Sequence, residues 1–180
     1  LDLDIRTQHS QEIYNLLLNH EIDTGFVITS FAYKNVVTRI LFTEPMVLLC
    51  QKDMPFPSAS IHPQDLDVKK EIFIDWSPEF RAWHDFWFNT VTSPRIKFNN
   101  PSLSHYFLKN NYWSIFPISM ARLLLKEMDL AVYPLTSPPP DRTIYQITHK
   151  EPLSNHIPVL TTFQKYVTYF QETTTLFQKL

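Results

Sequence analysis

Glycine is nearly missing from this sequence of 180 residues, which has Gly25 alone against 14 prolines. Phosphate-binding loops, dinucleotide-binding fingerprints and the nucleophile elbow of α/β-hydrolases all need several glycines, because their backbones turn sharply or approach a ligand closely. The sequence excludes all three motifs. We expect asparagine to occupy the positions whose backbone needs a positive φ. The candidates are Asn19, Asn99, Asn100, Asn110 and Asn111.

Cysteine is almost as rare, since Cys50 is the only one and lies in the apolar run 46–50. A disulfide within the chain is therefore impossible, which favours a reducing, cytoplasmic compartment. We expect Cys50 to be a small buried residue rather than a redox sensor. The 7 histidines form no His-x-x-x-His pair and have no cysteine partner, so the sequence predicts no metal site and no cofactor.

Charge and long hydrophobic runs are also scarce. Charged residues make up 19% of the chain and the net charge is −2, whereas a surface that grips nucleic-acid phosphates is basic. The apolar stretches are far shorter than the ~20 residues that span a bilayer, and the first residues lack the basic start of a signal peptide. The sequence thus predicts no membrane partner and no DNA binding by this chain itself. With 44% hydrophobic residues it can bury a sizeable core.

The first thirty residues predict a strand, a helix and a strand. Residues Leu1–Arg6 alternate apolar and polar side chains, as a half-buried strand does. Ser10 is a candidate N-cap for a helix with Ile13, Leu16 and Leu17 on one face. Residues Ile22–Ile28 read as a buried strand. This order is typical of parallel strands joined by a crossover helix.

The next segment contains the clearest helix start. Two strands are expected at 36–42 and 45–51, then a loop at 53–63 that includes Pro55 and Pro57. A strand at 71–75 leads into Trp76-Ser77-Pro78, where Ser77 caps the helix and Pro78 takes its first position. We expect this helix to place on one side the residues Phe80, Trp83, Phe86 and Trp87.

The rest of the chain continues to alternate strands and helices. Strands are expected at 95–98, 112–116, 130–135 and 144–149, and helices from Asn100-Pro101, over 117–125 and from about Asn155 to the end. An aromatic-rich middle block bounded by proline-rich loops indicates a second lobe inserted into the first, with the chain crossing twice. The sequence therefore predicts an α/β protein of two lobes.

Several segments, in this order and spacing, resemble the effector-binding domain of LysR-type transcription regulators almost end to end. They are Ser10–Leu17 followed by Ile22–Phe26, Phe42–Leu49 with its Glu44-Pro45 step, Asp53–Phe56, Ile115–Pro117 and Ile144–Lys150. Two positions depart from the family pattern. His20 stands where the family has a glycine before the strand, and Asn110-Asn111 lack the family's glycine.

The resemblance implies a type 2 periplasmic-binding-protein-like fold, with two Rossmann-like lobes joined by two crossover strands. Lobe I would comprise residues 1–50 and 144–180, and lobe II residues 51–143. The family domain opens with a further strand and helix before the position of Leu1, so lobe I is expected to lack them here.

Candidate ligand contacts follow from the strand ends. In open α/β sheets, ligands bind beyond the carboxyl ends of strands, beside helix N-termini with unpaired N–H groups and partial positive charge. The residues so placed are Ser10, Thr29, Trp76, Ser77, Asn100 and Ser102. Hydroxyl and N–H donors beside an aromatic wall suit a small anionic ligand, such as a carboxylate with an apolar body. Two alternatives stay open: the polar residues only cap helices, and Trp76 belongs to the core.

The function that the resemblance implies is effector sensing rather than catalysis. A small effector would bind between the lobes and shift an equilibrium between conformations. The domain would pair as a homodimer or tetramer, and DNA would be bound only by a separate N-terminal helix-turn-helix domain. One alternative is a solute-binding protein of a transporter with the same fold. Another is an enzyme, which would need convergent titratable groups that the sequence does not offer.

Overall fold

The computed structural model describes residues 3–54, 56, 58–88, 94–108 and 111–177. The chain divides into two compact units, unit 1 with Leu1–Thr43 and Thr143–Thr175, and unit 2 with Glu44–Arg142 and Leu176–Leu180. The sequence placed the first boundary after residue 50. In the structure β3 (Met46–Gln51) belongs to unit 2, because both strands that pair with it lie there.

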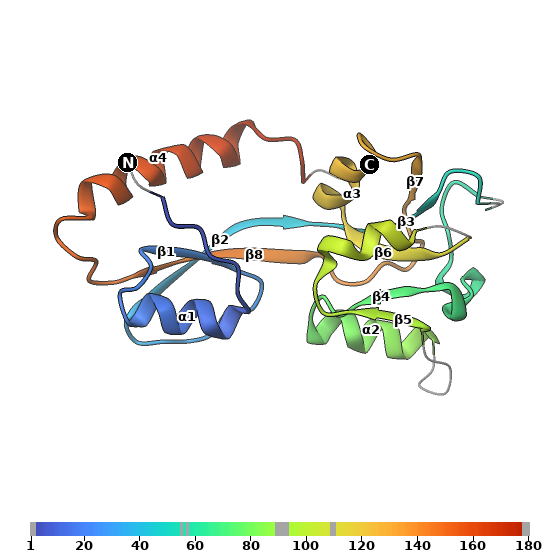
Figure 1. Cartoon of the computed structure of the whole chain (residues 1–180), viewed down its shortest axis with the longest axis horizontal. Coiled ribbons are helices and arrows are strands. Elements are labelled where there is room, and N and C mark those ends of the chain that lie inside the picture. The colour runs from blue at the N-terminus through green and yellow to red at the C-terminus, as the bar shows by residue number, and fades with distance from the viewer. Residues whose placement is uncertain (1–2, 55, 57, 89–93, 109–110, 178–180) are drawn as a thin grey trace. The chain divides into compact units, whose positions relative to one another are not determined.

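Unit 1 is built on a sheet of three strands in the order β1 (Thr24–Val27), β8 (Arg142–His149) and β2 (Val36–Glu44). The helices α1 (Ser10–Leu18) and α4 (Ile157–Thr173) lie on opposite sides of this sheet (Figure 1). Tyr14 and Leu17 of α1 are fully buried because they pack on the sheet. The core of unit 1 is formed by Tyr14, Leu17, Val27, Val36 and Ile147.

Two predictions for the start of the chain are wrong. Residues 3–9 form no strand, and the apolar side chains Leu3 and Ile5 are exposed; Leu1 and Asp2 lie outside the described residues. Alternation alone does not make a strand, since the backbone also needs a neighbouring strand to pair with. The expected parallel pair is also absent, because β1 pairs antiparallel with the distant strand β8.

The backbone at the two ends of α1 also differs from expectation. The N-cap is His9 rather than Ser10, and the Glu12 carboxylate accepts a hydrogen bond from the His9 N–H at 3.0 Å. Among the described non-glycine residues, φ is positive at His20 (57°) and Asn111 (62°). The prediction for Asn111 is confirmed, those for Asn99 and Asn100 are wrong, and Asn110 lies outside the described residues. At the end of α1, however, the residue with positive φ is His20 and not Asn19.

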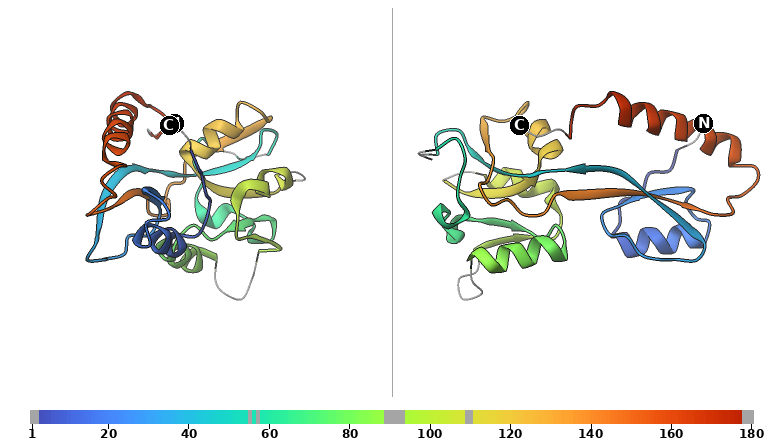
Figure 2. Two further views of the ribbon diagram at one scale, coloured as in Figure 1. Left: turned by 60° about the vertical axis from the view of Figure 1, so that its left-hand side comes forward. Right: turned by 180° about the vertical axis from the view of Figure 1, so that it is seen from behind.

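Unit 2 contains two small sheets. In one, β3 lies between β6 (Trp113–Pro117) and β7 (Leu130–Tyr133), antiparallel to both. In the other, β4 (Ile72–Ile74) and β5 (Ile96–Phe98) are parallel, and a parallel bridge from Glu71 to Trp113 connects them to β6. Figure 2 shows these strands from two further sides. The helical segments are η1 (Pro63–Asp65), η2 (Val68–Lys70), α2 (Pro78–Phe88), η3 (Pro101–Phe107) and α3 (Ile118–Leu124).

Helix α2 presents a different face to the core from the one expected. Its buried residues are Phe80, His84 and Phe88, which recur every fourth position and so lie along one stripe. Phe86 was expected on the packed face but is exposed. The aromatic residues of this helix are too numerous for their spacing to identify the inward stripe. Pro55 and Pro57 of the expected loop lie outside the described residues.

Candidate functional site

Four predicted site residues follow the strand ends at one end of a sheet in unit 2. Trp76 and Ser77 follow the end of β4, and Asn100 and Ser102 follow the end of β5. Because β4 and β5 are parallel, with Ile74 opposite Phe98, their carboxyl ends lie at the same end of the sheet. We call this end, with Trp76, Ser77, Asn100 and Ser102, the candidate edge.

Both helical segments at the candidate edge begin with the cap that the sequence predicted. The Ser77 hydroxyl accepts a hydrogen bond from the Phe80 N–H at 3.1 Å, at the start of α2. The Asn100 side-chain oxygen accepts one from the Ser102 N–H at 2.9 Å, at the start of η3. Helix α2 directs its N-terminus, and so its partial positive charge, to this edge. Ser77 and Asn100 therefore act as caps, and their contact with a ligand stays a prediction.

Trp76 lies in the core of unit 2. It is 5% exposed, its indole N–H donates to the Ile115 carbonyl at 2.7 Å, and its ring packs edge-on against Phe116. The guanidinium of Arg142 lies 5.4 Å from the centre of the Trp76 ring. The side chain is therefore held rigidly, and its role in ligand contact stays a prediction.

A buried ion pair beside Trp76 was missed by sequence reasoning. One oxygen of the Glu44 carboxylate accepts hydrogen bonds from Arg142 Nη2 at 2.6 Å and from Nε at 3.1 Å. The other oxygen accepts the Ser119 N–H at 2.9 Å, at the N-terminus of α3. The side chains of Glu44 and Arg142 are 0% and 16% exposed. The pair thus joins the end of β2 to the start of β8, where both strands reach the boundary of unit 2.

The remaining predicted contacts belong to unit 1. Ser10 is the first residue of α1 and is half-buried, and Thr29 follows β1 and is also half-buried. Neither residue belongs to the core of unit 1. Their roles in ligand binding stay predictions.

The structure also places the residues that bear on other chemistries. Cys50 is fully buried, and burial, with a smaller contribution from Asp53, raises the pKa of its thiol to about 12. A thiol with so high a pKa is a poor nucleophile at neutral pH.

Within the described ranges, no group of three His, Cys, Asp or Glu side chains is placed to hold a metal ion. No helix in the part of the chain that the structure describes has the length and apolar character to cross a membrane.

An α/β chain in two units, with two strands that pass from one unit to the other, defines the class of type 2 periplasmic-binding-protein-like folds. The model of the LysR substrate binding domain matches residues 1–165. The chain therefore belongs to the LysR substrate-binding domain family, and the fold expected from the sequence is confirmed. No curated protein matches the sequence.

Solved structures of low sequence identity share the fold. The reduced form of the OxyR regulatory domain from Pseudomonas aeruginosa is 21% identical, with a TM-score of 0.65 over 89% of this chain and 79% of that one. The CcmR regulatory domain from Synechocystis PCC6803, in complex with 2-PG, is 14% identical, with a TM-score of 0.71 over 96% and 84%. The effector binding domain of QuiR, in complex with shikimate, is 19% identical, with a TM-score of 0.64 over 92% and 79%.

Proposed function

We propose that this chain senses a small-molecule effector on behalf of a LysR-type transcription regulator. The observation that carries the proposal is the candidate edge, where the ends of two parallel strands, the N-terminus of α2 and the polar caps Ser77 and Asn100 share one end of a sheet. Family membership supports a regulator over a solute-binding protein of a transporter, and over an enzyme. The complexes of CcmR with 2-PG and of QuiR with shikimate support a small molecule as the effector.

The chemistry of the candidate edge favours an anionic effector. The partial positive charge at the start of α2 attracts negative charge, and hydroxyl and amide side chains beside it can donate hydrogen bonds. The cation over the Trp76 ring, Arg142, is already neutralised by the buried carboxylate of Glu44. We therefore propose that the helix start and its neutral donors, rather than a free arginine, hold a carboxylate-type ligand.

The experiment is a thermal-shift screen of the chain against small carboxylates, amino acids and aromatic acids. A ligand that binds only the folded state at a hundredfold excess over its dissociation constant stabilises the protein by about 2.7 kcal/mol. Ser77→Ala is expected to reduce that shift, because the hydroxyl lies at the candidate edge. Ser154→Ala, which removes an exposed hydroxyl in unit 1, is the matched control and should keep it.

The outcomes separate clearly. A hit that Ser77→Ala weakens and Ser154→Ala does not would support the proposed site. A hit that Ser77→Ala leaves unchanged would contradict the candidate edge while keeping the sensing function. A panel of several hundred small anions without any hit would contradict the proposal of an anionic effector.

We also propose that the chain pairs with a second copy of itself, as regulators of this class act as oligomers on DNA. Supporting this, α4 of unit 1 exposes several large apolar side chains, which is unusual for a helix that faces only water. They are Ile157, Val159, Tyr166, Tyr169 and Phe170. DNA binding itself is proposed for a separate helix-turn-helix domain, since the net charge of this chain is −2.

A further inference from the structure

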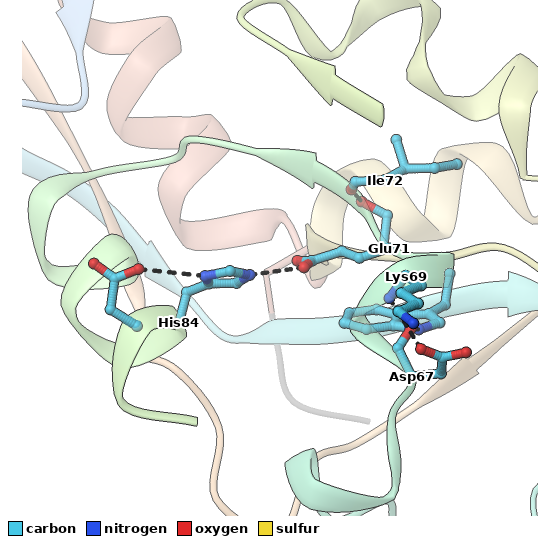
Figure 3. Close-up of polar contacts among 8 residues, drawn as sticks. Asp67, Lys69, Glu71, Ile72 and His84 are labelled. Atoms are coloured by element: carbon cyan, nitrogen blue, oxygen red, sulfur yellow. Dashed lines mark hydrogen bonds and ion pairs between the residues drawn. The ribbon is translucent and has the colours of Figure 1, made fainter. Parts of the chain in front are cut away.

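A buried acid–base pair in unit 2 takes no part in the candidate edge. Glu71 Oε2 and His84 Nε2 lie 2.7 Å apart, and the two side chains are 1% and 9% exposed. Figure 3 shows them pointing toward each other, Glu71 from the residue before β4 and His84 from α2. Glu71 precedes β4 whereas Trp76 follows it, so the pair lies at the opposite end of the strand from the candidate edge.

The surroundings of the pair are apolar. The His84 ring packs against Phe73 and Phe88, with ring centres 4.7 and 5.0 Å away, and against Phe80 at 6.4 Å. A net charge is costly in such an environment. When the pair holds one shared proton its net charge is zero, and when that proton is lost the net charge is −1. The aromatic surroundings therefore favour the state that keeps the proton.

A few other charged groups act on the pair. Asp85 Oδ1 lies 3.7 Å from His84 Nδ1, and its side chain is half exposed, so solvent screens most of its effect. Lys97 acts on Glu71 from β5 and favours the ionised carboxylate. The charged groups on the elements around the pair are Glu79, Arg81 and Asp85 of α2, Lys97 of β5, and Asp67, Lys69 and Lys70 at η2.

Burial raises the pKa of the Glu71 carboxyl above its ordinary value, and the hydrogen bond and charge of His84 offset part of that rise. A group whose pKa is higher in the folded state binds its proton more tightly there than in the unfolded chain. The stabilisation that this proton brings is complete below the unfolded pKa of about 4.5. It is lost as the pH rises through the folded pKa.

We propose that Glu71 and His84 form a proton-operated switch that controls how α2 packs on unit 2. With the shared proton, the hydrogen bond between His84 and Glu71 holds the inward face of α2 against the start of β4. When the proton leaves for solvent, the buried pair carries a net negative charge and α2 packs less tightly. Because α2 begins at Pro78, next to Ser77, the change reaches the candidate edge.

The test is chemical unfolding of the 180-residue chain without any ligand, between pH 5 and pH 9, so its result does not depend on the effector proposal. As the pH rises, the unfolding equilibrium constant of the wild type should increase by up to tenfold per pH unit in the range where the folded pair still holds the proton that the unfolded chain has lost. Glu71→Gln keeps the size and a hydrogen-bond acceptor but removes the carboxylate, and should lose this dependence. Glu127→Gln, at an exposed glutamate, should keep it. Equal pH dependence in Glu71→Gln and the wild type would overturn the switch.

A second measurement needs no variant, in case Glu71→Gln does not fold. The side-chain carboxyl carbon of Glu71, assigned by NMR through the backbone of the wild type, should titrate above the ordinary glutamate range near ~4.3. The amide signals of α2 should shift in the same transition. Titration of Glu71 within the ordinary range, or α2 signals that do not follow it, would overturn the proposal.

Discussion

At the scale of single residues, Gly25 is required by packing and not by backbone conformation, since its φ is not positive. A Cβ at this position of β1 would lie 2.5 Å from Ile13 Cγ2 of α1 and 3.1 Å from Ile147 Cγ1 of β8. The contact with Ile13 is shorter than real Cβ atoms make, and the contact with Ile147 is tighter than most of them make. Gly25→Ala should therefore push α1 away from the sheet and destabilise the protein by about 1–3 kcal/mol, measured by urea unfolding.

The control for this prediction uses the residue that causes the clash. Ile13→Ala removes the Cγ2 methyl, so the cost of Gly25→Ala should be smaller in the Ile13→Ala background than in the wild type. A double-mutant cycle measures this difference as a coupling free energy. If the free-energy costs of the two substitutions are additive, the close approach of α1 to β1 is not the reason that position 25 requires glycine.

Single residues also show what local sequence can predict. Ser77 and Asn100 were predicted as caps because a proline follows each of them, and this signal is confined to neighbouring residues. The positive φ of His20 was not predicted, because the preference of asparagine for that conformation is only statistical. The burial of Trp76 depends on Phe116 and Arg142, which lie far along the chain. The local sequence around Trp76 therefore left its place in the core or in the ligand site open.

At the scale of elements, the Glu44–Arg142 pair connects β2, β8 and the start of α3. Glu44→Gln keeps an acceptor for the Ser119 N–H but removes the charge that neutralises Arg142. Removal of one partner of a buried ion pair costs about 3 kcal/mol or more, because the other charge is left without compensation. We expect a loss of that size in urea unfolding, followed by the tryptophan fluorescence of the chain.

A second substitution distinguishes the ion pair from a general effect at position 44. In Glu44→Gln/Arg142→Met the uncompensated charge is gone, and part of the lost stability should return. The reference is the loss of stability that Arg142→Met causes alone. If Arg142→Met causes the same loss in the Glu44→Gln background, the two side chains contribute independently to stability.

Elements with local signals were predicted well, and those that depend on distant partners were not. The strand β4 and the start of α2 were predicted from Ser77-Pro78 and the short apolar run before them. The expected strand over residues 1–6 had the right alternation, but the described strands do not pair with residues 3–6. Glu44 and Arg142 are 98 positions apart, and no pattern in a single sequence joins residues at that distance.

At the scale of the whole molecule, the order of the segments identified the family before any contact was known. The Glu44-Pro45 step and the strand ending at Lys150 carried that resemblance, and the family model matches residues 1–165. The candidate edge in unit 2 follows from strand order as well, because parallel neighbours place their ends together. Contacts of Ser10 and Thr29 with an effector depend on the ligand itself, and they stay predictions.

The proposed pairing of two copies is the prediction that concerns the whole chain. Two tyrosines of α4, Tyr166 and Tyr169, are 69% and 65% exposed. A second copy of the chain that covered them would bury a large apolar area. Sedimentation of the wild type at micromolar concentration should therefore give a dimer, and Tyr169→Glu should shift it toward monomer by placing a charge in the contact. Tyr106→Glu makes the same change at a tyrosine of unit 2 that is 59% exposed, and should leave the dimer intact. A wild-type monomer at every concentration, or equal effects of the two substitutions, would exclude α4 as the contact.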